Sequence, residues 1–139
     1  MTNEPQSASA ALLVRPAGFG FNAEAAATNV FSHGSSDPEF AAKALSEFDG
    51  LARRLSDAGV EVLVMEDSAE PPKPDAVFPN NWFSTHADGT LVLYPMATPP
   101  RRLERRQDAL EALFDGEGFR VERTVDLSGH EQEQRFLEG

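Results

Sequence analysis

The chain has 139 residues, 40% of them hydrophobic and 25% charged, which is typical of a soluble globular protein with one domain's worth of core. Its formal net charge of −11 disfavours nucleic acid and anionic membranes as partners. It has no cysteine, which excludes disulfides and thiolate metal sites, and no apolar run approaches the roughly 20 residues of a membrane-spanning helix.

The first part of the chain predicts a tail followed by a strand. Residues 1–11 are polar or small and are expected to form a disordered tail. They lack the basic and apolar regions of a signal peptide, so we expect a cytoplasmic protein. The apolar run from Ala11 to Val14 predicts a buried strand that ends at Arg15-Pro16. Residues 23–31 fit either a loop or a helical turn.

A helix and a second strand follow. Asp37-Pro38-Glu39 has the capping residue, first-turn proline and acidic residue of a helix start. Apolar residues then recur at spacings of three and four up to Leu55, which predicts an amphipathic helix ended by Gly59. The run from Val60 to Met65 is apolar almost throughout and predicts a strand buried on both faces.

The central stretch predicts a β-hairpin. After the acidic, proline-containing connector from Glu66 to Lys73, the runs Val77–Phe83 and Leu91–Tyr94 flank Asp88-Gly89. Such a dipeptide between strand-like runs is a strong hairpin signal because glycine adopts the positive φ that the turn needs. Proline residues then close the second strand.

The second half repeats the order of the first. Residues 103–114 predict a helix with Leu103, Leu110, Leu113 and Phe114 inward, and Phe119–Leu127 predicts a strand. The second half is therefore a ββαβ module, and the first half looks like the same module with an irregular second strand. An approximate repeat near 60 residues indicates a modular propeller.

Four arginines gather at the start of the second helix, namely Arg101, Arg102, Arg105 and Arg106. A solvated helix face is the usual interpretation of arginines at this spacing. Cations at a helix N-terminus oppose its dipole, however, at about 0.3–1 kcal/mol each when exposed. A bound anion would offset that cost, so both interpretations stay open, with ligand binding favoured for Arg101. The three histidines lack metal-ligand spacing and fit surface or hairpin positions.

Several separated motifs resemble one enzyme family. They are Val14-Arg15-Pro16, Pro74-Asp75-Ala76-Val77-Phe78, Asn80-Asn81, Arg101-Arg102-Leu103-Glu104 and Phe136-Leu137-Glu138-Gly139. Together they resemble the guanidino-group-modifying enzymes, or penteins, which include dimethylarginine dimethylaminohydrolase, arginine deiminase and the amidinotransferases. The likeness is strongest to the branch of amidinotransferase-related, citrulline-utilisation hydrolases.

The resemblance implies an α+β fold that is part of a five-bladed α/β propeller of ββαβ modules. Residues 12–139 would form the N-terminal part of the catalytic domain. Its modules would span residues 12–66 and 74–127, and a third would begin at 136–139, where the chain is expected to be truncated. Two modules would leave sheet edges unpaired, so self-association through them is expected.

The resemblance also implies roles for six residues. Arg101 matches the arginine that holds the substrate's α-carboxylate, while Asp75 and Phe78 match residues of the pocket. From composition alone, Asp75 is more often a turn residue, and Phe78 fits either a pocket wall or plain core. Asn80 and Asn81 replace an acidic pair that grips a cationic guanidinium, and neutral amides suit a ureido group such as that of citrulline. From composition they fit turn amides equally well. Glu138 matches the acid that orients a catalytic histidine.

The expected function is therefore part of a hydrolase or amidinotransferase-like enzyme. Its substrate would be a free amino acid with a guanidino or ureido group: citrulline, arginine or methylated arginine. In the family a cysteine thiolate attacks the guanidino or ureido carbon. Because this chain has no cysteine, we expect it to be inactive alone, and we expect no metal, organic cofactor, nucleic acid or membrane partner. A non-catalytic amino-acid-binding or interaction module is the alternative, and a product without function is a third.

Overall fold

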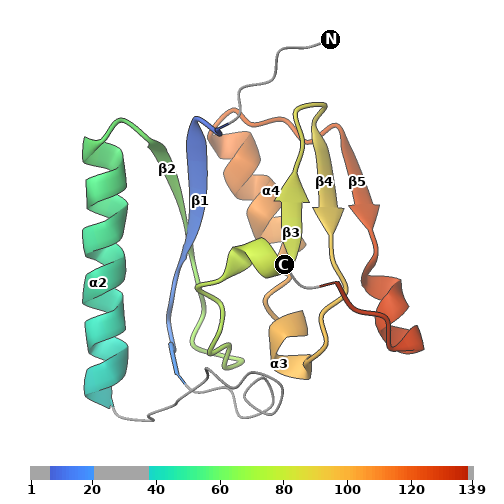
Figure 1. The fold of residues 1–139 in the computed structure, drawn as a ribbon, viewed down its shortest axis with the longest axis horizontal. Coiled ribbons are helices and arrows are strands. Elements are labelled where there is room, and N and C mark those ends of the chain that lie inside the picture. The colour runs from blue at the N-terminus through green and yellow to red at the C-terminus, as the bar shows by residue number, and fades with distance from the viewer. Residues whose placement is uncertain (1–6, 21–37, 138–139) are drawn as a thin grey trace.

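The computed structural model describes residues 7–20 and 38–137, which form a mixed α/β fold with two small sheets (Figure 1). In the first sheet, β1 (Ala10–Arg15) pairs in parallel with β2 (Glu61–Glu66). The helix α2 (Pro38–Asp57) lies between them in sequence and contacts both strands. The predicted first strand is confirmed. It begins at Ala10, slightly before the domain start expected at residue 12.

The second sheet has the order β3-β4-β5. The strands β3 (Phe83–Thr85) and β4 (Thr90–Leu93) form the predicted antiparallel hairpin. The helix α4 (Gln107–Gly116) then leads to β5 (Arg123–Asp126), which pairs in parallel with β4. The second half thus has the predicted ββαβ order. The irregular strand expected in the first half falls mainly on residues 21–37, which lie outside the described residues.

The helix α2 ends as the sequence predicts but buries less than expected. Gly59 follows it with φ +88°, the left-handed conformation that suits a glycine after a helix. Phe48 is the buried side chain on α2, whereas Phe40 and Leu51 are 41% and 50% exposed. The prediction for β2 was wrong in one respect, because Leu63 and Met65 are buried while Val62 and Val64 are only half-buried.

The first strand of the hairpin is shorter than the predicted run Val77–Phe83. A 3-10 helix, η1 (Pro79–Asn81), occupies the middle of that run, and β3 begins only at Phe83. Pro79 has no amide hydrogen to give a neighbouring strand, and its fixed φ suits the first position of a helical turn. The Phe78 carbonyl accepts from the Asn81 amide, so the chain turns here instead of extending.

The helix predicted over residues 103–114 begins later than expected, after a separate short helix. A short helix, α3 (Pro99–Arg102), ends before Leu103, and α4 begins at Gln107 after Arg106 adopts φ −91° and ψ 68°. Leu103 is consequently 48% exposed, so its predicted inward orientation is wrong. Leu110 and Phe114 are buried, as predicted. The strand predicted over Phe119–Leu127 is limited to β5 because β4 offers only four partner residues.

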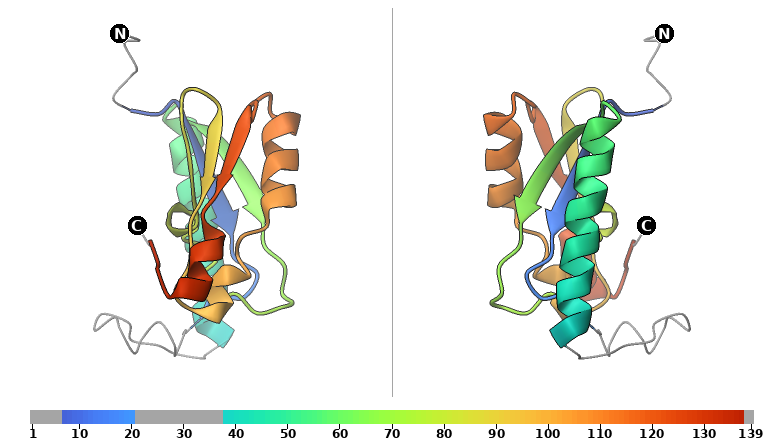
Figure 2. Two further views of the ribbon diagram at one scale, coloured as in Figure 1. Left: turned by 90° about the vertical axis from the view of Figure 1, so that its right-hand side faces the viewer. Right: turned by 90° about the vertical axis from the view of Figure 1, so that its left-hand side faces the viewer.

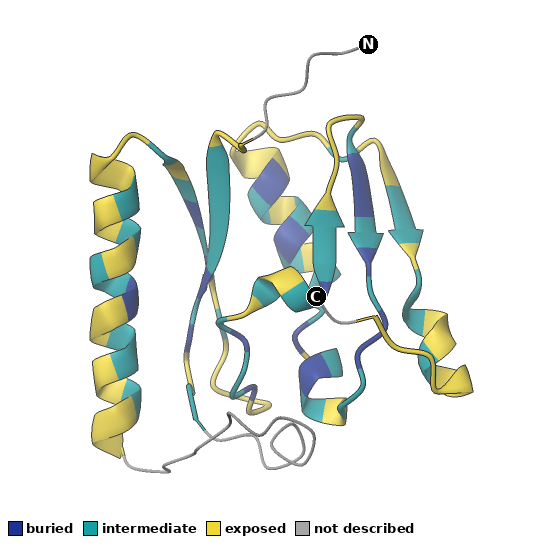
Figure 3. Cartoon of the chain, in the orientation of Figure 1, coloured by how far each residue is buried: buried dark blue, intermediate teal, exposed yellow. Residues whose placement is uncertain are grey.

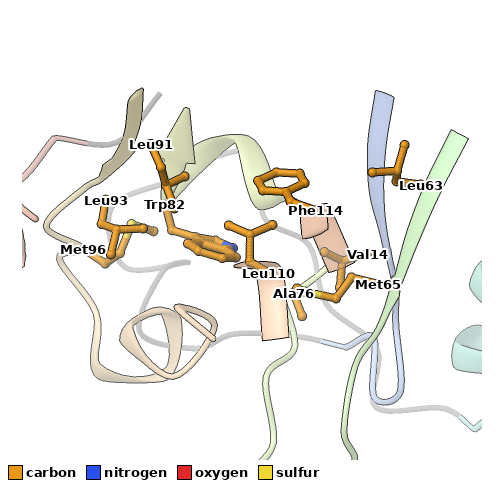
Figure 4. Packing of buried hydrophobic residues seen from close by; sticks show 10 residues of the cluster. All are labelled: Val14, Leu63, Met65, Ala76, Trp82, Leu91, Leu93, Met96, Leu110 and Phe114. Carbon is orange, nitrogen blue, oxygen red and sulfur yellow. The ribbon is translucent and has the colours of Figure 1, made fainter. Parts of the chain in front are cut away.

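The core lies between α4 and the second sheet and reaches the first sheet through Val14, Leu63 and Met65. Figure 2 shows α4 on one side of both sheets, and the buried positions concentrate on its inner face and on β4 (Figure 3). Trp82 is fully buried and lies among the side chains of Leu91, Met96 and Leu110 (Figure 4). The base of the hairpin is therefore anchored in the core. Among the described residues no helix is long and apolar enough to cross a membrane.

The hairpin turn generates a first prediction, which concerns Gly89. It has φ +78°, and a Cβ added there would lie 2.6 Å from the Glu122 Cγ and 3.2 Å from the Glu122 amide nitrogen. Gly89→Ala should lower the free energy of unfolding by about 1–3 kcal/mol, measured by urea denaturation, because it combines backbone strain with overlap.

Gly50→Ala is the matched control for this prediction. Gly50 lies inside α2 with nothing within 4 Å of an added Cβ, so the substitution should raise stability by about 0.5–1 kcal/mol. Equal effects of the two substitutions would contradict the account of the turn.

Candidate functional site

The candidate site is built on the turn that precedes the hairpin. The Phe78 amide donates to the Asp75 carbonyl at 3.0 Å, and the Trp82 amide donates to the Pro79 carbonyl at 3.2 Å. These bonds fold residues 75–82 into consecutive tight turns. The buried side chains of Ala76 and Trp82 fix both ends of this segment in the core. The polar and aromatic groups between them are thereby held on a rigid base.

Arg101 connects this turn to α3. Its guanidinium donates from Nη1 to the Asn81 Oδ1 and from Nη2 to the Phe78 carbonyl, each at 3.1 Å. It also forms a bidentate ion pair with the Glu104 carboxylate, in which Nε donates to Oε1 at 3.1 Å and Nη2 donates to Oε2 at 3.0 Å. The arginine side chain is only 10% exposed. Most of its hydrogen-bonding capacity is used within the described part of the protein.

Glu104 is the buried counter-ion of Arg101, with a side chain only 2% exposed. Burial raises the pKa of Glu104 to about 7, against the hydrogen bonds and positive charge of Arg101, which act to lower it. The negative charges of Asp75 and Asp67 also contribute to this rise. Glu104 therefore lies at the centre of a group of carboxyl groups, and its ionisation depends on the arginine beside it.

Lys73 and Asp67 form a second buried ion pair. The Lys73 Nζ lies 3.2 Å from the Asp67 Oδ1, with both side chains at most 2% exposed. The same ammonium also donates to the carbonyls of Ser68 and Pro71. The Arg106 Nη1 approaches Asp67 Oδ1 at 3.4 Å, while Asp67 Oδ2 is buried and has no hydrogen-bond partner among the described residues.

The remaining arginines of the cluster are also engaged. Arg102 donates from Nε to the Met96 carbonyl at 2.9 Å, and Arg105 pairs with both oxygens of Glu131. Glu131 in turn accepts from the Met96 amide at 2.7 Å. Glu131 belongs to η2 (Ser128–Glu133), so it ties the segment after β5 to the end of the hairpin. Of the two interpretations left open for these arginines, the structure contradicts that of a fully solvated helix face.

The structure brings together some of the residues assigned by resemblance and separates others. Phe78, Asn81 and Arg101 are joined by hydrogen bonds. Asp75 is half-buried and close enough to Glu104 to affect its pKa. Asn80 is exposed and lines a groove apart from the Arg101 contacts. Glu138 lies outside the described residues, as does His33, one of the three histidines.

The groove that contains Asn80 has a volume of about 840 Å³ and runs between β1 and the hairpin. Apolar residues on both sides line it, including Leu12, Leu63 and Phe83. At the hairpin the Ser84 hydroxyl bonds to the Tyr94 hydroxyl at 2.7 Å and to the His86 Nε2 at 3.1 Å. His86 thus belongs to the hairpin, as its position in the sequence indicates. In residues 7–20 and 38–137 no group of three or more His, Asp or Glu side chains could hold a metal ion.

A family model described as N,N dimethylarginine dimethylhydrolase, eukaryotic, matches residues 15–139 of the chain. The chain belongs to this family. Membership in the dimethylarginine dimethylhydrolase family confirms the predicted relation to the pentein superfamily of guanidino-group-modifying enzymes. The matched residues include the turn 75–82 and the arginine cluster. Searches of curated proteins and of solved structures gave no match.

Sequence reasoning missed the acidic partners of the cluster in this dimethylarginine dimethylhydrolase relative. The sequence indicates Glu104 only as the last residue of a family motif, and no pattern singles out Asp67 or Glu131. The spacing of three residues between Arg101 and Glu104 was a usable signal, because side chains three apart on a helical turn are neighbours. No local spacing links Asp67 to Arg106 or Glu131 to Arg105, since these contacts depend on the tertiary fold.

The second prediction concerns the loss of Arg101. Arg101→Met would leave Glu104 buried without its counter-ion, which should cost about 3–5 kcal/mol of unfolding free energy at pH 8. When a carboxyl group has a higher pKa in the folded than in the unfolded protein, the free energy of unfolding falls as the pH rises from the unfolded pKa to the folded pKa. Removing Arg101 raises the folded pKa of Glu104 further, so the cost should be smaller at pH 5.5 than at pH 8.

Arg120→Met serves as the control in the same urea denaturation series. Arg120 is 83% exposed and pairs with Glu122 at the surface, so its loss should cost less than about 1 kcal/mol at either pH. A pH-independent effect of Arg101→Met, or one as small as that of Arg120→Met, would contradict the buried pair.

Proposed function

We propose that this chain provides the part of a dimethylarginine dimethylhydrolase relative that binds a free amino acid with a ureido or guanidino group. Family membership supports the substrate class. The hydrogen-bonded group of Phe78, Asn81 and Arg101 supports the position of the site. That grouping is the observation on which the proposal rests, because it joins residues 20 or more apart in sequence that the family resemblance assigns to one pocket.

Each of these residues has a proposed role. The guanidinium of Arg101 holds the α-carboxylate of the ligand, Phe78 supplies an apolar wall, and Asp75 contacts the polar end of the ligand. Phe78 is 45% exposed and so has surface to cover a ligand. Glu138 is proposed to orient the histidine that protonates the leaving nitrogen.

A ureido ligand is proposed over a guanidinium because of Asn80 and Asn81. An amide carries both a donor and an acceptor and no charge, whereas a guanidinium has only donors and a full positive charge. Arg101 already donates to Asn81 Oδ1. A cationic ligand at this amide would therefore lie close to the positive charge of Arg101. Neutral citrulline therefore fits the pair better than arginine or methylated arginine.

Hydrolysis in the proposed mechanism begins with attack of a cysteine thiolate on the ureido or guanidino carbon. These 139 residues contain no cysteine, so we propose that the chain by itself binds without hydrolysing. The complete catalytic domain is proposed to be a five-module propeller, to which residues 12–66 and 74–127 contribute two modules. Each described sheet has two edge strands, and these are proposed to mediate self-association.

A non-catalytic binding module is the second candidate. The absence of cysteine from these 139 residues favours it, as do the three largely buried ion pairs, in which charged groups find partners among the described residues. The two candidates share the binding step and differ in whether a thiolate supplied from elsewhere restores turnover.

The third prediction tests the binding step by isothermal titration calorimetry. The chain should bind citrulline more tightly than arginine. The double variant Asn80→Asp/Asn81→Asp should reverse this order by about tenfold or more, since two carboxylates favour a cation. Gln132→Glu is the control, because Gln132 is exposed in η2, away from the turn. Equal binding of both ligands by all three proteins would contradict the proposed ureido preference, and absence of binding would contradict the function.

A further inference from the structure

We propose that Glu104 competes with the carboxylate of the ligand for Arg101, so that binding of the amino acid is coupled to protonation of Glu104. This inference rests on the proposed function, in which Arg101 holds the α-carboxylate. It adds a residue that the family resemblance does not assign. Glu104 would not touch the ligand and would act by positioning and releasing Arg101.

The first argument is the use of the five N–H groups of Arg101. Nε and one Nη2 hydrogen go to Glu104, the other Nη2 hydrogen goes to the Phe78 carbonyl, and one Nη1 hydrogen goes to Asn81. The described contacts account for four of the five N–H groups of a guanidinium. A carboxylate that binds an arginine strongly takes two parallel N–H groups. In the described contacts one N–H remains, so a ligand carboxylate that takes two must draw one from a present partner, and Glu104 holds two of the four N–H groups in use.

The second argument is charge. A ligand carboxylate at Arg101 would add a negative charge next to buried Glu104. Asp75, in the turn before η1, and Asp67, directly after β2, already raise the pKa of Glu104 through their charges. Lys73 and Arg106 pair with Asp67, which leaves Arg101 as the cation that bonds to Glu104 directly. Two carboxylates that share one buried guanidinium are unfavourable unless one of them takes up a proton.

The third argument is that protonation changes what Glu104 can accept. An ionised carboxylate has only acceptors, whereas a protonated carboxyl keeps one carbonyl acceptor and gains an O–H donor. Protonated Glu104 would satisfy one N–H of Arg101 and release the other to the ligand. Burial has already brought the pKa of Glu104 to about 7, so the proton is available at little cost near neutral pH.

The test is calorimetric titration of the whole chain with citrulline at pH 6 and pH 8, in two buffers of different ionisation enthalpy. Binding should be about tenfold tighter at pH 6 than at pH 8, because the protonated fraction of a group with a pKa of about 7 is about tenfold larger at the lower pH. At pH 8 up to about one proton should be taken up per ligand. N-carbamoylputrescine, which is citrulline without its carboxylate, should bind without this uptake.

Two variants complete the design. Glu104→Gln should remove the proton uptake and the pH dependence and should bind at pH 8 about as tightly as the unmodified chain at pH 6. Glu47→Gln, at an exposed position of α2 with a side chain 71% exposed, should behave like the unmodified chain. If Glu104→Gln fails to fold by circular dichroism, the proton uptake of the unmodified chain still decides the question.

The outcomes separate the two proposals. Citrulline binding with equal affinity at both pH values and no proton uptake would overturn the role of Glu104 and leave the proposed function intact. Proton uptake that persists in Glu104→Gln would also overturn it, by assigning the proton to another group. Absence of binding by the unmodified chain and by Glu104→Gln at both pH values would overturn the proposed function, and the competition with it.

Discussion

The buried pair of Arg101 and Glu104 is the interaction on which the candidate site depends. A charged guanidinium and a carboxylate so far from water are tolerated only when each satisfies the other and the remaining polar atoms find partners. Here the remaining partners of Arg101 are the Phe78 carbonyl and the Asn81 amide. Those partners are the groups that set the shape of the turn before the hairpin. The ion pair of Arg101 and Glu104 therefore also holds the turn at residues 78–81 in place.

This constraint also explains the interrupted helix. A continuous helix through residues 99–116 would have pointed Leu103 inward, as the apolar pattern predicts. The chain instead leaves helical geometry between α3 and α4, exposing Leu103 and burying Glu104. The helix α4 then starts at Gln107 with Leu110 and Phe114 in the core. At this break the paired carboxyl group of Glu104 is buried and the side chain of Leu103 is exposed.

The other arginines extend the same logic to the ends of the fold. Arg106 reaches Asp67 after β2, and Arg105 reaches Glu131 after β5. An acidic chain thus concentrates its cations where three segments distant in sequence converge. The individual bonds are ordinary, but because several are shielded from solvent they are less screened than surface pairs. The result is a polar framework beside the apolar core.

The sequence predicted the parts of this arrangement that local patterns control. Gly59 marked the end of α2, Asp88-Gly89 marked the hairpin, and the apolar spacing of Leu110 and Phe114 marked the buried face of α4. It did not predict the 3-10 turn at Pro79, because the apolar residues around that proline are equally suited to a strand. The partners of the arginines were also missed, since Asp67 and Glu131 reach the cluster only through the tertiary fold. The family resemblance assigns Arg101 and Asn81 to the two ends of one ligand, and did not predict the hydrogen bond that joins their side chains.

A double-mutant cycle on Arg101 and Glu104 tests the central claim most directly. The free energy of unfolding at pH 8 would be measured for the unmodified chain, Arg101→Met, Glu104→Leu and the double variant. If the pair organises the site, the double variant should be more stable than Arg101→Met, with a coupling energy of about 1–3 kcal/mol. Additive effects, with a coupling energy near zero, would show that the two residues act independently and would contradict the account.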